Sequence, residues 1–322
     1  MTLLSLNDNK FYGELPKEFG KLVNLKNFLI GNNEISGQMP EELGDMASLE
    51  KLHLMFNKID GTIPASLSKL TNMNDFKIFK NKIEGSLPPS LRNWAKLQYF
   101  QIGGNAIEGS MDIFDSTTMT SLEVIDLGGN VITGQLPMDI FRLPKIKTFA
   151  APLNCLSGFL PRCICNAVTL EHLILSSLTS GKGCREYFVS ANSTTFTGFQ
   201  APENMDGVLP ACLYNLPKLH TLYAAGNSFL GQLPAEISPD LLELDVSGNR
   251  LNGDLPDSFA TSNLEILYIN NNRLSGTLDK FQDRNSTLTA SSKSFVLNAT
   301  VNRLSGTIPS KFYDISVNKL AI

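Results

Sequence analysis

The chain has 322 residues, a formal net charge of −4 and a sequence pI near 5.5. This acidic balance lacks the basic stripe that a nucleic-acid-binding protein needs, so we expect no nucleic-acid partner. Hydrophobic residues make up 42% of the chain, which favours a packed protein over a disordered one. No apolar run approaches the roughly 18 residues of a membrane span. We therefore expect contact with a membrane only through a segment that this chain lacks.

One sequence motif recurs from the first residues onward. In order, it contains an apolar residue, Asn, a second apolar residue, Gly and a third apolar residue, and it often ends in Pro. The first copy has Leu6, Asn9, Phe11, Gly13, Leu15 and Pro16. The first five copies of the Asn are 24 residues apart, and self-similarity at that period predicts a solenoid. The Asn residues are Asn9, Asn33, Asn57, Asn81, Asn105, Asn130, Asn154, Asn227, Asn249, Asn272 and Asn302.

The third copy, residues 49–70, indicates how one coil folds. Leu52 and Leu54 alternate with polar neighbours, and this period of two predicts a short strand with its apolar side inward. Asn57 follows where the chain turns away, and its amide can bond to backbone groups that would otherwise be buried unpaired. Leu67 and Leu70 suit a helical or 3₁₀ turn that closes the coil. Stacked coils then align their strands into one parallel sheet on the concave side of the stack.

The repeated pattern LxxLxLxxNxLxGxIPxxLxxLxxL is similar to the plant-type leucine-rich repeat. The resemblance implies a leucine-rich-repeat solenoid of the α/β horseshoe class, with about 12–13 coils. Short 3₁₀, helical or extended segments are expected on the convex side. We expect a single solenoid over 1–322 that is a fragment without caps. Two parts depart from the pattern: a degenerate coil or bulging loop at 179–202, and an irregular C-terminal end at 279–322.

Five cysteines lie within 58 residues, from Cys155 to Cys212. If every coil keeps its length, Cys163 and Cys212 occupy equivalent places two coils apart, at roughly 10 Å, which is too far for a disulfide. Cys184 lies on the coil between them, so we expect it to bond to Cys163 or Cys212. Cys155 and Cys165 remain alternative partners for Cys184.

Three glycosylation sequons begin at Asn192, Asn285 and Asn298. Together with the clustered cysteines they favour an extracellular or cell-surface location. The start of the chain, from Met1, has no basic region and no long apolar stretch, so it is not a signal peptide. A cytoplasmic location therefore stays open.

Catalytic chemistry is not expected. The three histidines lie on separate coils, and no nucleophile, phosphate-binding or zinc motif accompanies them. Carboxylates on the concave face, such as Asp126 and Asp245, lie too far apart for a glycosidase pair. We expect a non-enzymatic protein without a metal or another cofactor.

The variable strand positions on the concave face are the candidate ligand-binding residues, because parallel stacking brings consecutive coils into one surface. Aromatic rings beside a cation are typical interface anchors. An aromatic and basic cluster is predicted over coils three to five, from His53 to Tyr99, with Phe56 in a neighbouring column. The candidates are His53, Met55, Lys77, Phe79, Tyr99, Gln101, Asp126, Tyr223 and Tyr268.

Three functional hypotheses follow from the resemblance and the candidate site. The first is a recognition module from a receptor-like ectodomain, which binds a peptide, protein or glycan on its concave face in signalling. The second is a secreted inhibitor resembling polygalacturonase-inhibiting proteins, which masks an enzyme. The third is a cytosolic scaffold.

Overall fold

The computed structural model describes residues 1–177, 204–281, 295–310 and 320–321. These residues form two compact units, with 1–157 in the first unit and the other described residues in the second. The expectations for Cys184, Asn192, Asn285 and the segment 179–202 lie outside the described residues. A single solenoid domain over 1–322 stays a prediction.

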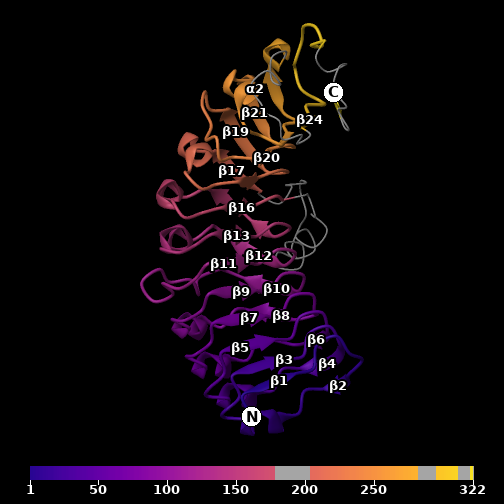
Figure 1. The fold of residues 1–322 in the computed structure, drawn as a ribbon, viewed down its shortest axis with the longest axis vertical. Helices are drawn as coiled ribbons and strands as arrows, with labels where there is room; N and C mark the ends of the chain where they lie inside the picture. The colour runs from indigo at the N-terminus through magenta and orange to yellow at the C-terminus, as the bar shows by residue number, and fades with distance from the viewer. Residues whose placement is uncertain (178–203, 282–294, 311–319, 322) are drawn as a thin grey trace, which may run out of the picture. The chain divides into compact units, whose positions relative to one another are not determined.

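The first unit is a stack of coils, and each coil contributes one strand to a parallel main sheet. The strands follow the order of the chain, and each pairs with the strand one coil later (Figure 1). They are β1 (Leu3–Ser5), β3 (Asn27–Leu29), β5 (Lys51–His53), β7 (Asp75–Lys77), β9 (Tyr99–Gln101), β11 (Val124–Asp126) and β13 (Thr148–Ala150).

Each coil of the first unit also supplies a second strand, and most supply a short 3₁₀ helix. The second strands form two smaller parallel sheets. These are β2 (Tyr12–Glu14), β4 (Glu34–Gln38) and β6 (Lys58–Asp60), then β8 (Glu84–Ser86), β10 (Ala106–Gly109), β12 (Val131–Gly134) and β14 (Cys155–Leu156). The 3₁₀ helices are η1 (Lys17–Lys21), η2 (Glu41–Asp45), η3 (Ala65–Lys69), η4 (Pro89–Asn93) and η5 (Met138–Arg142).

The second unit repeats this plan. Its main-sheet strands are β16 (His172–Ile174), β18 (Thr221–Tyr223), β20 (Glu243–Asp245), β22 (Ile266–Tyr268), β24 (Val296–Asn298) and β25 (Leu320–Ala321). Its second sheet has β15 (Gly158–Phe159), β17 (Met205–Val208), β19 (Ser228–Gln232), β21 (Arg250–Asp254) and β23 (Arg273–Ser275). Two 3₁₀ helices, η6 (Arg162–Asn166) and η7 (Ala211–Asn215), and one short helix, α2 (Ser258–Thr261), complete its described elements. The described main strands number seven in the first unit and six in the second, in agreement with the predicted 12–13 coils.

The core of each coil comes from the inward strand positions and the 3₁₀ helix. In coil three, Leu52, Leu54, Leu67 and Leu70 are fully buried. Each such side chain contributes roughly 1.5–3 kcal/mol when it is removed from water. The side chains that alternate with them on the main sheet point outward and form what we call the strand face. The residues of the strand face are therefore free of the core and available for other roles.

The repeated asparagines link each coil to the coil before it. Asn57 donates from Nδ2 to the backbone oxygens of Leu54, at 3.1 Å, and of Ile30 in the preceding coil, at 3.0 Å. Its Oδ1 accepts from the Ile35 N–H at 2.9 Å. The other asparagines from Asn33 to Asn302 donate in the same way to backbone carbonyls of their own and an earlier coil. The side-chain amide of Asn9, in the first coil, donates only to oxygens of its own coil.

Asn57→Ala should lower the free energy of unfolding by about 1–3 kcal/mol, because it leaves polar backbone groups of two coils without their partner. Urea denaturation followed by circular dichroism measures this loss. The control is Asn93→Ala at an exposed position of η4, where a change within about 0.5 kcal/mol is expected. Equal stability of the two variants would contradict a ladder role for Asn57.

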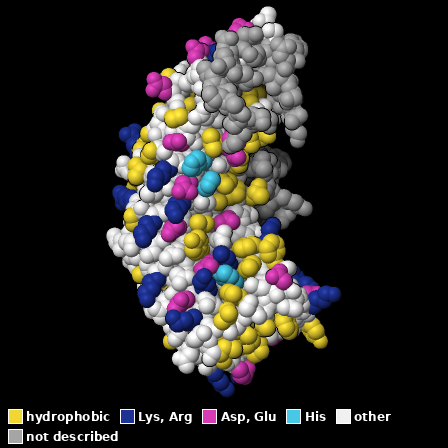
Figure 2. Space-filling view, viewed as in Figure 1, with side chains coloured by type: hydrophobic (Ala, Val, Ile, Leu, Met, Phe, Trp, Pro, Cys, Tyr) yellow, Lys and Arg dark blue, Asp and Glu magenta, His cyan; other side chains and the backbone are white. Residues whose placement is uncertain are grey.

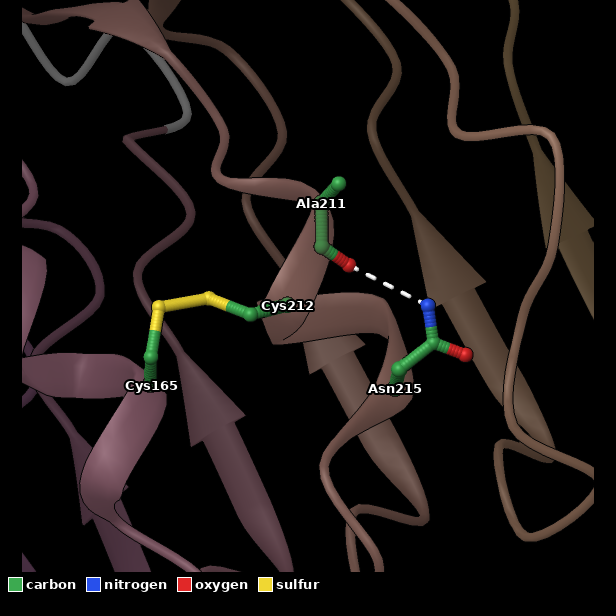
Figure 3. Close-up of a disulfide and its surroundings, with 4 residues drawn as sticks. All are labelled: Cys165, Ala211, Cys212 and Asn215. Carbon is green, nitrogen blue, oxygen red and sulfur yellow. Dashed lines mark hydrogen bonds between the residues drawn. A yellow bond between two sulfur atoms is a disulfide. The ribbon is translucent and has the colours of Figure 1, made fainter.

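A disulfide in the second unit joins Cys165 of η6 to Cys212 of η7, with 5.6 Å between the two Cα atoms (Figure 3). The expected bond between Cys184 and Cys212 is therefore wrong. Cys155 also takes part in a disulfide. Strand β16 pairs directly with β18, in register from His172 to Thr221. The coils that carry η6 and η7 are thus neighbours, whereas the expected cysteine pairing assumed a full coil between them.

Candidate functional site

Four of the predicted site residues lie on adjacent strands of the first unit. The register aligns His53 with Lys77 and then with Gln101, while Asp75 aligns with Tyr99. His53, Lys77, Tyr99 and Gln101 are each half-buried. Their side chains alternate with Leu52, Phe76 and Phe100, which are fully buried. The strand period therefore places the polar and aromatic groups on the strand face, above an apolar core.

A polar network centred on Asp75 connects these strands. Oδ2 of Asp75 lies 2.8 Å from His53 Nε2 and 3.2 Å from Lys77 Nζ. Lys77 Nζ also lies 5.5 Å from the centre of the Tyr99 ring, which is a cation–π distance. Asp75 is 5% exposed, and its Oδ1 has no hydrogen-bond partner among the described residues.

Two opposing effects set the pKa of Asp75. Burial raises it, but the hydrogen bond and charge of His53, with the charge of Lys77, bring the pKa below its ordinary value. Asp75 is therefore a carboxylate at neutral pH and balances the Lys77 charge. The sequence pattern led us to expect Lys77 as a cation beside aromatic rings in a binding surface, and Asp75 was missed. The signal was present in the strand alternation, since positions 51, 75 and 99 must be neighbours on one face.

Beside this network lies an apolar group made of Met55, Phe56 and Phe79. The Phe56 and Phe79 rings meet edge to face, with 5.2 Å between their centres. The Met55 side chain lies over Gly31, where a Cβ atom would come within 2.7 Å of the Met55 Sδ. We call the polar network and the apolar group together the strand-face cluster: His53, Met55, Phe56, Asp75, Lys77, Phe79 and Tyr99. In Figure 2 a histidine in the first unit is surrounded by basic, acidic and hydrophobic side chains.

Gln101 and Asp126 continue the same face of the first unit, since they are register partners on β9 and β11. Asp126 Oδ1 accepts from the Gly128 N–H at 3.0 Å. Burial raises the pKa of Asp126, and that hydrogen bond lowers it by less. Gln101 is the strand partner of Lys77, but among the described residues no side-chain hydrogen bond or ion pair joins Gln101 or Asp126 to the strand-face cluster.

Tyr223 and Tyr268 belong to the second unit and form a separate group. The register aligns both with Asp245. The Tyr223 hydroxyl donates to Glu243, and burial, then this bond, raises the Tyr223 pKa above its ordinary value. His172 lies nearby on the same sheet, with Nδ1 3.1 Å from Thr221 Oγ1. A ligand-binding role for any of these residues stays a prediction.

Three other features of the described residues bear on the site. They include no group of three or more His, Cys, Asp and Glu side chains that could hold a metal ion. None of the helices within these ranges is long and apolar enough to cross a membrane. An open, mostly polar cavity of about 900 Å³ in the first unit is lined by Glu14, Glu42 and Asp60, among others, and by none of the predicted site residues.

Asn298, the one sequon asparagine within the described residues, ends β24 and is half-buried. Its Oδ1 accepts hydrogen bonds from the Thr300 N–H and hydroxyl. It therefore lies in a regular strand of the main sheet. Glycosylation of Asn298 stays a prediction.

Comparison with known proteins identifies the repeat and finds proteins with similar sequences and folds. The Leucine Rich Repeat family model matches residues 48–70, 121–143, 240–262 and 263–282. Receptor-like protein 18 of Arabidopsis thaliana is 28% identical over 219 residues, which are 61% of this chain and 23% of the relative. Receptor-like protein 53 of Arabidopsis thaliana is 32% identical over 152 residues, 47% of this chain and 16% of the relative. The chain thus spans less than a quarter of the length of these two curated relatives.

Solved structures of plant receptors have the same fold. The structure of a TDR receptor superimposes with a TM-score of 0.77 at 26% identity, over 94% of this chain and 48% of that one. A second similar structure is the ectodomain of the plant membrane receptor kinase GASSHO1/SCHENGEN3 of Arabidopsis thaliana, solved in complex with CASPARIAN STRIP INTEGRITY FACTOR 2. It superimposes with a TM-score of 0.76 at 25% identity, over 95% of this chain and 36% of that one.

The repeat, the stacked parallel strands and these matches show that the chain has a leucine-rich-repeat solenoid fold. Within that fold it is similar to receptor-like proteins of Arabidopsis thaliana and to the ectodomain of a plant membrane receptor kinase.

Proposed function

We propose that this chain is a non-catalytic recognition part of a receptor-like ectodomain, and that it binds a peptide on the strand face of its first unit. The observation that carries the proposal is the strand-face cluster, where three aromatic rings lie beside a charged network on consecutive coils. Half-exposed rings supply contact area, and the polar groups fix orientation. The similar GASSHO1/SCHENGEN3 ectodomain was solved with a bound partner, and a further similar structure is that of PEPR1-AtPEP1.

The proposed location is extracellular or at the cell surface. The Cys165–Cys212 disulfide supports it, because such bonds form and persist in oxidising compartments. The same bond argues against a cytosolic scaffold. The curated relatives are receptor-like proteins, which favours a receptor role over that of a secreted enzyme inhibitor.

Tyr99→Ala should weaken the binding of a peptide ligand by 1 kcal/mol or more, about fivefold, because the ring contributes contact area and holds Lys77 in place. The probe is a phage-displayed library of random peptides, selected on the wild-type chain. The affinity of the selected peptides is then measured by calorimetric titration on the wild type and the variant. Stability should change little, since the Tyr99 side chain points away from the core.

The matched control is Tyr12→Ala, which removes an 86% exposed tyrosine from β2, outside the main sheet. It should leave both the affinity and the melting temperature unchanged. A Tyr99→Ala variant that melts earlier but binds as tightly as the wild type would mean that the ring is structural. Peptides that lose affinity with Tyr12→Ala instead would move the binding surface away from the strand face.

A further inference from the structure

The residue immediately before each repeated asparagine has a left-handed backbone conformation. Its φ lies between 53° and 69° in every coil from Asn9 to Asn302 whose asparagine is described. Most of these positions hold Gly, Asn or Asp, which tolerate this conformation. The exceptions are Phe56, Lys80, Leu153 and Val301. A Cβ atom there crowds the backbone, so these four residues store strain that the fold itself does not require.

Phe56 combines this strain with an exposed aromatic ring. Its φ is 53° and its side chain is 50% exposed. The two coils after Lys80 have glycine at the same position, Gly104 and Gly129, so the turn forms without a side chain. The edge contact with Phe79 contributes an energy of the same order as the strain. Packing alone therefore gives little reason for a large ring at position 56.

The charge next to Phe56 is positive. Lys80 occupies the same position one coil later, is exposed, and forms no ion pair with a described residue. Its side chain extends over Gly104, where the Lys80 Cδ lies 2.9 Å from the place of a Cβ. Lys77, by contrast, is balanced by Asp75. Lys80 thus presents a positive charge that no described carboxylate balances, one coil from the exposed ring.

We propose that Phe56 and Lys80 determine the specificity of the strand-face cluster, and that they receive a peptide segment in which a large apolar or aromatic side chain adjoins a carboxylate. The Phe56 and Phe79 rings would contact the apolar side chain, and the Lys80 ammonium group would meet the carboxylate. This inference rests on the function proposed above. It explains why a strained conformation is kept at two consecutive coils beside the cluster.

Selection from the random-peptide library on three glycine variants tests the inference. Phe56→Gly and Lys80→Gly each remove a side chain and relieve its strain. Leu153→Gly is the matched control, because it relieves the same strain in the same unit, away from the cluster. The wild type should enrich peptides with an aromatic or large apolar residue next to Asp or Glu. Phe56→Gly should lose the apolar enrichment, Lys80→Gly the acidic enrichment, and Leu153→Gly neither.

The affinity of a peptide selected on the wild type should fall about tenfold with Phe56→Gly. The melting temperature of this variant should stay the same or rise, as for Leu153→Gly. Unchanged affinity of Phe56→Gly for peptides that still depend on Tyr99 would overturn this inference and leave the proposed function standing. A lower melting temperature for Phe56→Gly, but not for Leu153→Gly, would make the ring structural and also overturn it. Failure of the wild type to enrich any peptide would overturn both.

Discussion

Trp94→Ala should lower the free energy of unfolding by about 3–5 kcal/mol, the usual loss when a large aromatic side chain is removed from a core. Trp94 follows η4 and is fully buried. Its ring lies 5.0 Å from that of Phe76, and its Nε1 donates to the Leu67 oxygen of the preceding coil at 3.0 Å. Truncation leaves a cavity and a buried carbonyl without its donor, so two losses add. Urea denaturation followed by far-ultraviolet circular dichroism measures the effect, since Trp94 is the one tryptophan of the chain.

Trp94→Phe separates the two losses. The Phe side chain keeps most of the apolar volume but lacks the hydrogen-bond donor. Trp94→Phe should therefore lower the free energy of unfolding by about 1–3 kcal/mol, which is less than the loss expected for Trp94→Ala. Equal losses for Phe and Ala would show that the hydrogen bond dominates. A loss below about 1 kcal/mol for Trp94→Ala would contradict the close packing around this ring.

The same core supports the candidate site. Phe76 is the central residue of β7, between Asp75 and Lys77, and it stacks on Phe100 at 5.7 Å. Phe100 holds the corresponding place between Tyr99 and Gln101 on β9. The outward groups of the strand-face cluster are thus carried by strands whose inward side chains are fully buried aromatic rings. A rigid scaffold of this kind holds binding groups in place before a ligand arrives.

Much of the fold could be predicted from the sequence, because each coil repeats the same local choices. The alternation around Leu52 and Leu54 predicted the strand, and the position of Asn57 predicted hydrogen bonds between coils. Both depend on spacing within one coil, which the sequence shows directly. The strands of the smaller sheets were expected only as extended segments on the convex side. That they pair into sheets could not be predicted, because the pairing depends on how neighbouring coils align.

The candidate site was predicted in part. Strand alternation placed His53, Lys77 and Tyr99 on one face. Asp75 was missed although it is the register partner of Tyr99, because only aromatic and basic side chains were singled out at that position. Asp75 changes the chemistry, since its carboxylate neutralises Lys77. The left-handed conformation of Phe56 also had a signal that we missed, because the position before the repeated asparagine holds Gly, Asn or Asp in most other coils.

The disulfide was mispredicted for a different physical reason. The distance from Asn154 to the next clear repeat equals a whole number of coils, so both a degenerate coil and a bulging loop stayed open, and the cysteine pairing was argued from the coil. The pairing of β16 with β18 shows that the two coils are neighbours. Chain length alone does not reveal which coils are neighbours in the stack.

Removal of the Cys165–Cys212 bond should lower the free energy of unfolding of the second unit by about 4 kcal/mol. The bond closes a loop of 47 residues in sequence, and the loss of loop-closure entropy from the unfolded chain gives this magnitude. It joins η6 to η7, so two neighbouring coils of the second unit depend on it. The double variant Cys165→Ala with Cys212→Ala avoids leaving one unpaired thiol. Amide hydrogen exchange of β16 and β18 reports the loss in the unit that carries the bond.

Asn215→Ala is the control for this experiment, because it alters η7 and keeps the disulfide. The exposed Asn215 side chain donates to the Ala211 oxygen at 3.3 Å (Figure 3). It also donates to the Glu236 oxygen at 3.2 Å, and loss of the two bonds should cost about 1 kcal/mol or less. The double cysteine variant should therefore exchange its β16 and β18 amides much faster than Asn215→Ala does. Similar exchange in the two variants would mean that packing between the coils, and not the covalent link, holds this part of the second unit together. Reduced thiols at Cys165 and Cys212 in the purified wild type would remove the basis of the extracellular proposal as well.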